Sequence, residues 1–250
     1  TYKGGTSFYS KDRTYIKEFQ QQLGNPNSLP FDDVNCFAQR ASGELLIGTN
    51  GGGLLVYDPV KEKFASFTNH ISDKFSISGN VIVSLFPDKT GAVWVGTYRG
   101  GLNRMNNDGT FTRFGDAIST NLSVWDIFED SRGRFWIGTL SHGLHLFDRK
   151  KGTFTPFLSK ANKRLPSTYY SKIFEDSRGN IWLGTATGIE IIGHDGEISL
   201  FREGRGTSGL SNNMVSDIVE DRFGRIWVST QQGVNVIEGR HVTKLNENTG

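Results

Sequence analysis

Recurring pairs of carboxylates are the residues of this sequence that most resemble a catalytic acid and base. They are Glu129-Asp130, Glu175-Asp176 and Glu220-Asp221. Each aspartate lies three residues before a glycine, where its side chain can accept hydrogen bonds from the backbone of a turn. A catalytic pair has no reason to recur in every unit of a repeat. We therefore interpret the pairs as turn formers and expect a non-catalytic segment.

Histidines offer another chemistry, because His142 and His145 have an H-x-x-H spacing. One is expected in a turn and the other in a strand. The remaining histidines are His70, His194 and His241. Their scatter argues against a zinc site. We expect no metal and no cofactor.

A repeat defines the elements that carry these side chains. Gly179–Thr185 reads GNIWLGT, and copies begin at Gly43, Gly91, Gly133 and Gly224, 42 to 48 residues apart. Four copies have a tryptophan at the same position, and the first has Leu46 there. Self-similarity at this period is typical of solenoids and propellers.

Each unit contains four short apolar segments bounded by turn residues, which is the pattern of strands and hairpins. Alternation puts Phe135 and Ile137 on one face of a strand and Trp136 and Gly138 on the other, so both faces need cover. A radial stack of four-stranded sheets provides that cover. We predict an all-β chain that forms β-propeller blades.

We predict one propeller segment over residues 1–250. It comprises an outer half blade at 1–30 and five full blades at about 31–77, 78–119, 120–166, 167–210 and 211–250. Thr1–Gly5 match Thr97–Gly101, so we interpret the chain as a piece of a seven-bladed ring that opens partway through a repeat. The missing inner strands lie upstream, or the piece stays open, or a second copy completes it.

Composition narrows the classes of function. The formal net charge is +2 without a run of basic residues, so the electrostatic pattern of a nucleic-acid-binding protein is missing. We expect no nucleic-acid partner. Cys36 is the only cysteine, which rules out a disulfide within the chain. No apolar run approaches the ~20 residues that a membrane helix needs.

The unit V-x-x-I-x-E-D-x-x-G-x-I-W-I-G-T-x-x-G-G-L-x-x-Y/F-D resembles the two-component regulator propeller repeat. Val124–Asp148 and Lys172–Gly188 match it best. The resemblance implies the periplasmic sensor part of a hybrid two-component system histidine kinase of Bacteroides-like bacteria. It further implies an oligosaccharide ligand, a homodimer and a parent chain anchored in the inner membrane. The kinase itself is not in this segment.

Ligand contacts are expected where the repeats differ, in the turns after the second strands and the loops that enter the innermost strands. The candidates there are Tyr98, Arg99, His142, Tyr169 and Tyr170, with Tyr2 and Lys3 in the half blade. The two adjacent tyrosines cannot both face the central channel. Arg99 could bind the carboxylate or sulfate of an acidic sugar, or it could be a solvated turn residue, as could His142.

Trp125 departs most from the repeat, since other blades have Asn35, Val83, Ser171 or Ser216 in its place. Its flat face could cover a sugar ring and its N–H could donate to a hydroxyl. It could equally plug the channel. Asp126, next to it, is a candidate carboxylate.

Three functions follow from the sequence. The first is an oligosaccharide-sensing segment that signals across the membrane. The second is a protein-interaction or dimerisation scaffold without a small ligand. The third is a propeller lyase or hydrolase, for which only His142, Asp32, Asp33 and Asp126 supply catalytic side chains.

Overall fold

The computed structural model describes residues 4–9, 16–25, 27–115, 118–160 and 164–245, and Tyr2 and Lys3 lie outside these ranges. The described chain has 22 strands and one short 3₁₀ helix, η1 (Gly206–Ser208). It divides into two compact units, Thr1–Val124 and Trp125–Gly250. Within the described residues, no helix has the length and apolar character needed to cross a bilayer.

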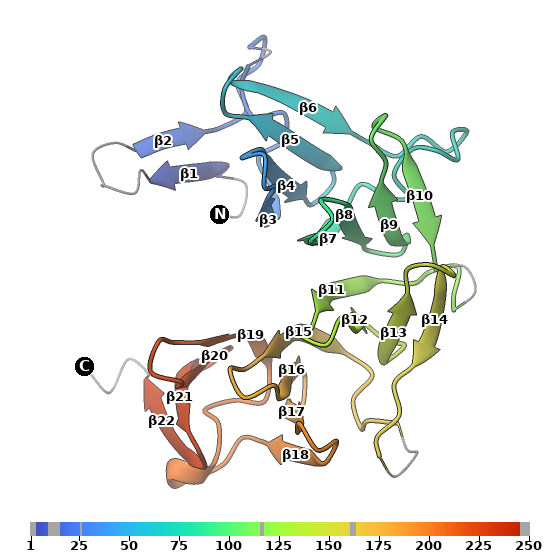
Figure 1. The fold of residues 1–250 in the computed structure, drawn as a ribbon. Helices are drawn as coiled ribbons and strands as arrows, with labels where there is room; N and C mark the ends of the chain where they lie inside the picture. The colour runs from blue at the N-terminus through green and yellow to red at the C-terminus, as the bar shows by residue number, and fades with distance from the viewer. Residues whose placement is uncertain (1–3, 10–15, 26, 116–117, 161–163, 246–250) are drawn as a thin grey trace. The chain divides into compact units, whose positions relative to one another are not determined.

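The first unit has one two-stranded and two four-stranded sheets, each with its strands paired in chain order (Figure 1). The pair is β1 (Thr6–Tyr9) and β2 (Ile16–Phe19). The four-stranded sheets are β3 (Val34–Gln39), β4 (Leu45–Thr49), β5 (Leu54–Asp58) and β6 (Lys63–Phe67), then β7 (Ile82–Pro87), β8 (Val93–Thr97), β9 (Gly101–Met105) and β10 (Phe111–Phe114).

The second unit has three four-stranded sheets of the same order. They are β11 (Val124–Glu129), β12 (Phe135–Thr139), β13 (Leu144–Asp148) and β14 (Thr153–Pro156); β15 (Tyr170–Glu175), β16 (Ile181–Thr185), β17 (Gly188–Ile192) and β18 (Ile198–Phe201); and β19 (Val215–Glu220), β20 (Ile226–Thr230), β21 (Gly233–Glu238) and β22 (His241–Leu245). β11 starts at the last residue of the first unit. The predicted all-β propeller fold is confirmed, whereas the seven-bladed ring stays a prediction.

Side-chain hydrogen bonds explain why the tryptophan motif recurs. The aspartate before each motif accepts a bond of 2.8 or 2.9 Å from the indole Nε1 six residues later. The pairs are Asp88–Trp94, Asp130–Trp136, Asp176–Trp182 and Asp221–Trp227. The motif threonine bridges the turn that follows the second strand. In the third blade, Thr139 Oγ1 donates a hydrogen bond to Gly143 O at 2.8 Å. The predicted turn-forming role of these aspartates is confirmed.

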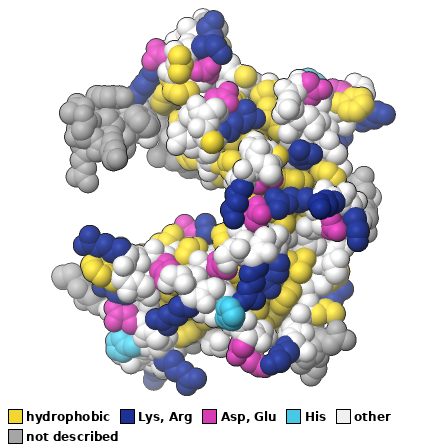
Figure 2. All heavy atoms as spheres, in the orientation of Figure 1, with side chains coloured by type: hydrophobic (Ala, Val, Ile, Leu, Met, Phe, Trp, Pro, Cys, Tyr) yellow, Lys and Arg dark blue, Asp and Glu magenta, His cyan; other side chains and the backbone are white. Residues whose placement is uncertain are grey.

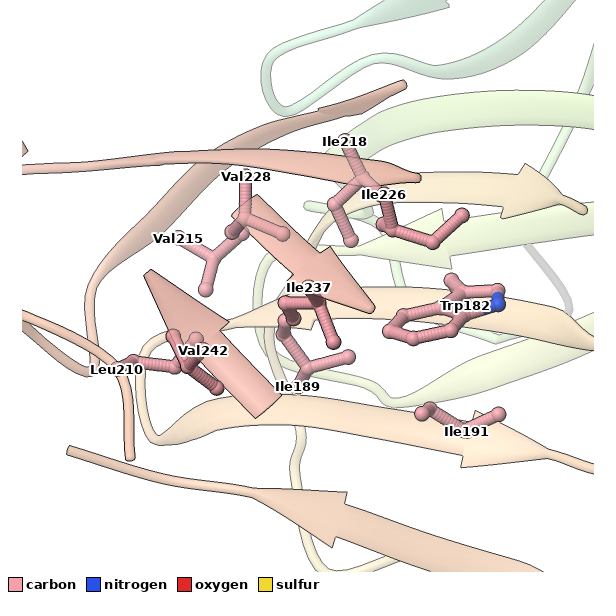
Figure 3. Close-up of a cluster of buried hydrophobic side chains, with 10 residues drawn as sticks. All are labelled: Trp182, Ile189, Ile191, Leu210, Val215, Ile218, Ile226, Val228, Ile237 and Val242. Carbon is pink, nitrogen blue, oxygen red and sulfur yellow. The ribbon is translucent and has the colours of Figure 1, made fainter. Parts of the chain in front are cut away.

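Two of the tryptophans also fill the cores between neighbouring sheets. Trp182, only 7% exposed, lies beside Ile226 and Ile218 of the following sheet (Figure 3). Trp136 is 0% exposed and clusters in the same way with the following sheet, at Ile173, Ile181 and Leu183. In the first unit, Leu46 takes the tryptophan's place and packs with Val93 and Val95.

The motif glycine is required by close approach of the next sheet. A Cβ on Gly48 would lie 2.8 Å from Ile82 Cγ2, and one on Gly184 would lie 2.9 Å from Val215 Cγ1. Both neighbours belong to the next innermost strand. The last sheet has Ser229 at this place, and its hydroxyl lies 2.8 Å from that of Ser216.

Candidate functional site

The innermost strands of the second unit place aromatic and charged side chains side by side. β15 contacts both β12 and β19. We call the following residues the inner-strand cluster: Trp125, Asp126, Tyr169, Lys172 and Asp217. They come from β11, from β15 and the residue before it, and from β19.

A recurring β-bulge distinguishes these innermost strands. The pairing with the second strand shifts by one residue between Val34 and Cys36, Ile82 and Ser84, Tyr170 and Lys172, and Val215 and Asp217. In each of these blades one residue has no partner in the register, and that residue aligns with Trp125 of the third blade. A bulge re-aims the side chain that it carries, and bulges are common next to binding sites.

Trp125 and Tyr169 form the aromatic part of the cluster. Their ring centroids are 5.9 Å apart with an interplanar angle of 72°, an edge-to-face contact. Both residues are partly exposed. Burial raises the pKa of the Tyr169 hydroxyl, against the effect of the Ser171 hydroxyl. The pair therefore presents a partly exposed apolar surface.

Asp126, Lys172 and Asp217 form the charged part. Asp126 Oδ2 accepts a 2.6 Å hydrogen bond from the backbone N–H of Ile173, and Lys172 Nζ lies 2.9 Å from Asp217 Oδ1. Burial raises the pKa of the Asp126 carboxyl to about 6, although the Lys172 ammonium acts in the opposite direction. At neutral pH the cluster thus offers carboxylate acceptors and an ammonium donor.

Lys172 is buried enough that desolvation alone would lower its pKa. The charges of Asp126 and Asp217 and the hydrogen bond to Asp217 outweigh that effect, and the pKa of Lys172 is raised. The lysine therefore stays protonated between two carboxylates. Mixed charges of this kind suit a neutral ligand with hydroxyl groups better than a highly charged one.

The expectation for Tyr170 is wrong. Tyr170 is 0% exposed and packs in the core with Trp136 and Ile173. Its single hydroxyl proton lies between two acceptors, Ser167 O at 2.9 Å and Glu190 Oε2 at 3.0 Å from the hydroxyl oxygen. Because its neighbour Tyr169 takes the exposed position, Tyr170 supports the loop from inside and cannot touch a ligand.

Tyr98 and Arg99 lie in the turn between β8 and β9 of the first unit. The guanidinium Cζ of Arg99 is 5.3 Å from the centroid of the Tyr98 ring, and both side chains are exposed. Arg99 has a positive φ of 61°, which is uncommon for a residue with a side chain. Its N–H donates to Ser123 Oγ at 3.0 Å. Tyr98 and Arg99 thus lie in a turn whose backbone is held by a hydrogen bond and whose guanidinium is exposed to solvent.

His142 and His145 lie in different elements and different surroundings. His142 lies in the β12–β13 turn, where its Nδ1 is 3.1 Å from Ser141 Oγ. His145 lies within β13, is 4% exposed, and has a pKa lowered by burial. Across the part of the chain that the structure describes, no group of three or more His, Cys, Asp or Glu residues could hold an ion.

Acidic and basic side chains are interspersed on the face of the molecule that Figure 2 shows.

Sequence reasoning missed Lys172 and Asp217. Both occupy the place of Asp126 in the next two repeats, where the first two blades have Cys36 and Ser84. The sequence therefore shows charged residues at the same position of three successive repeats. Whether these side chains contact one another depends on how the strands pack, which the sequence does not show.

The fold and the cluster define this chain as a β-propeller segment with a polar and aromatic surface on its innermost strands. Four stretches, residues 76–99, 118–141, 164–187 and 209–232, match the family described as two component regulator propeller. These four stretches are repeats of that family, as the sequence pattern predicted.

Solved structures share this fold at low sequence identity. The extracellular domain of a putative hybrid two-component system from B. thetaiotaomicron has a TM-score of 0.78 at 22% identity, over 98% of this chain and 38% of that one. A second such domain from that bacterium has a TM-score of 0.72 at 22% identity, over 97% and 32%.

Virginiamycin B lyase from Staphylococcus aureus has a TM-score of 0.73 at 14% identity, over 99% of this chain and 79% of the lyase. The chain spans less than two-fifths of the two extracellular domains. No curated protein sequence matches the chain significantly. Because extracellular domains of putative two-component systems and a lyase share the architecture, the likeness establishes the fold alone.

Proposed function

We propose that this chain is a ligand-sensing segment of the periplasmic part of a membrane-anchored hybrid two-component sensor kinase. The four matches to the two-component regulator propeller family support the sensor role. The similarity to extracellular domains of putative hybrid two-component systems supports a location outside the inner membrane. The segment itself is non-catalytic in this proposal, and the kinase belongs to the parent chain.

The ligand proposed is an oligosaccharide, and the inner-strand cluster carries the proposal. A sugar ring has an apolar face of C–H groups and a rim of hydroxyls. Trp125 and Tyr169, 5.9 Å apart, supply the apolar surface, while Asp126, Lys172 and Asp217 supply acceptors and a donor. Ligand sites typically combine aromatic lining with a few placed polar groups in this way.

Calorimetry against a panel of neutral and acidic oligosaccharides tests the proposal. We expect at least one glycan to bind and Trp125→Ala to weaken it roughly tenfold or more, equivalent to about 1.4 kcal/mol. Phe223→Ala is the matched control, because Phe223 is an aromatic residue of the same unit, 68% exposed, and outside the cluster. Equal effects of the two substitutions would place the ligand elsewhere.

Arg99→Ala distinguishes the class of sugar. If an acidic or sulfated glycan uses the Arg99 turn, this substitution weakens that glycan and leaves neutral glycans unchanged. A uniform effect on both classes would indicate damage to the turn, which the circular-dichroism melting curve would reveal.

The alternative proposal is a dimerisation or interaction scaffold without a small ligand. Light scattering over a range of concentrations tests the homodimer. A dimer that forms with no glycan response in calorimetry or thermal shift would favour the scaffold over the sensor.

A further inference from the structure

The first full blade lacks the pair of residues that joins the turn to the core in the other four. Arg40 lies three residues before the motif glycine, where those blades have an aspartate, and Leu46 lies where they have the tryptophan. The blade therefore has a guanidinium donor in place of a carboxylate acceptor. It also has a smaller side chain in place of an indole.

The guanidinium of Arg40 has more N–H groups than acceptors. Nη1 donates to Glu44 Oε2 at 2.9 Å, and Nη2 donates to Met105 Sδ at 3.1 Å, although a thioether is a weak acceptor. Nε is buried and has no hydrogen-bond partner among the residues that the structure describes. Buried polar atoms without a partner are rare and costly, so an acceptor brought by a ligand would stabilise this side chain.

A cavity of about 1070 Å³ lies beside Arg40 within the first unit, and Phe67 and Met105 form part of its apolar wall. By strand register, Phe67 corresponds to Phe114 and Phe201. The rings of these two residues lie 5.9 and 6.1 Å from the tryptophans of their own blades. The cavity is thus bordered by Arg40 and Phe67, which take the places of the usual partners of an indole. We call it the Arg40 cavity.

Arg104 is a second basic residue in the lining. The other blades have apolar residues at the same register, namely Val56, Leu146, Ile191 and Val236. Two departures from the repeat therefore converge on one cavity. Its acidic residues are already bonded, since Glu44 accepts from Arg40 and Asp108 Oδ1 accepts from the N–H and hydroxyl of Thr110 at 3.0 and 2.6 Å. With two basic and two acidic residues in its lining, the cavity suits a ligand with a single negative charge.

We propose that the Arg40 cavity binds an aromatic carboxylic acid. The ring of the ligand lies against Phe67. Its carboxylate displaces the Met105 thioether and accepts two parallel bonds from Nη2 and Nε of Arg40, which share one edge of the guanidinium. The thioether is then free to contact the ring edge, a favourable arrangement. The ligand thereby replaces the pair of aspartate and indole found in the other blades, with donor and acceptor exchanged.

This site is independent of the inner-strand cluster, because the Arg40 cavity belongs to the first unit and the cluster to the second. Failure of one site to bind its ligand would therefore leave the other proposal unaffected.

Calorimetry with three small probes tests the proposal. We expect indole-3-carboxylate to bind with a Kd of about 1 mM or tighter. Indole-3-carboxamide has a similar shape without the charge and should bind at least about tenfold more weakly. Acetate, which lacks the ring, should bind more weakly still. Failure of indole-3-carboxylate to bind, or equal binding of this acid and either of the other probes, would overturn the proposal.

Variants of the chain locate the site. Arg40→Gln should weaken the binding of indole-3-carboxylate roughly tenfold or more. Arg222→Gln is the matched control, because Arg222 is an exposed arginine 4.7 Å from the Phe223 ring centroid and does not line the cavity. Equal effects of the two substitutions would contradict the assignment.

A double variant tests whether the ligand occupies the place of an indole. Arg40→Asp combined with Leu46→Trp restores the pair of residues that the other blades have. We expect it to abolish the binding of indole-3-carboxylate and to raise the melting temperature, because the new indole fills the space beside Phe67. A folded double variant that binds the acid as tightly as the wild type would show that the proposal is wrong.

Discussion

Trp136 Nε1 donates a 2.8 Å hydrogen bond to Asp130 Oδ2, and both side chains are 0% exposed. The other carboxylate oxygen, Oδ1, accepts the N–H groups of Arg132 and Arg134 at 3.1 and 2.8 Å. One carboxylate thus joins the β11–β12 turn to the core between two sheets. The hydrogen bond from indole to carboxylate recurs in the other three blades that carry tryptophan.

Asp130→Ala should therefore destabilise the second unit by about 2–4 kcal/mol, because it leaves a buried indole N–H and two turn N–H groups without their acceptor. Urea unfolding followed by tryptophan fluorescence measures the loss. Asp195→Ala is the control, since Asp195 is an exposed turn aspartate that accepts one bond, from Glu197 N at 3.0 Å. A control as damaging as Asp130→Ala would contradict the role assigned to the indole contact.

The same carboxylates predict sensitivity to acid. Burial alone would raise the pKa of Asp88 and Asp176, but hydrogen bonds from Thr90 and Trp94, and from Asn180 and Trp182, hold both pKa values below the ordinary value. A lowered pKa in the folded state adds stability above the unfolded pKa, and this stability is lost as the pH falls through the folded pKa.

We expect the melting temperature to fall as the pH is lowered from about 4 to about 2. Combined Asp88→Asn and Asp176→Asn substitutions should lower it at neutral pH and flatten its acid dependence. Asp195→Asn is the control, and its melting temperature should fall with pH as steeply as that of the wild type. If the melting temperature of the double variant also falls as steeply as that of the wild type, the assignment is wrong.

Gly184→Ala tests the close approach of neighbouring sheets. The added methyl group would meet Val215 Cγ1 at 2.9 Å, so we expect a loss of about 1–3 kcal/mol from overpacking. Ser229→Ala, at the same place in the last sheet, should cost less because a side chain already fits there. Equal losses in denaturant unfolding would argue against the packing explanation.

Asp126 should titrate near neutrality. Its pKa is raised to about 6, mainly by burial, with Lys172 and Asp217 as the charged groups that face it. Folding favours the protonated form, so ionisation costs stability as the pH rises from about 4 to about 6. A carbon-13 NMR titration should give a carboxyl midpoint near 6 that Asp126→Asn removes.

Asp126→Asn should also be more stable than the wild type at neutral pH, because the amide oxygen can still accept the Ile173 N–H bond without carrying a charge. The difference should close below about pH 4, where the wild-type carboxyl is protonated in both states. A midpoint near 4, or a less stable variant at neutral pH, would show that the carboxylate is better solvated than the structure indicates.

The sequence by itself determined the strands, the turns and the buried tryptophans. These features depend on residues close together in the chain, such as Asp130 and Trp136, and the repeat displays them several times in register. Local hydrogen bonds and alternation of side chains follow directly from such spacing. The all-β propeller fold was therefore predictable, and so was the structural role of the carboxylate pairs.

Only the tertiary structure decided which candidate site residues meet. Tyr169 and Tyr170 are adjacent, yet Tyr169 contacts Trp125 while Tyr170 is buried against Glu190. The charged contacts of Lys172 likewise depend on how one sheet packs on the next. A bulge shifts the strand register by one residue, and that shift sends a side chain to the opposite face.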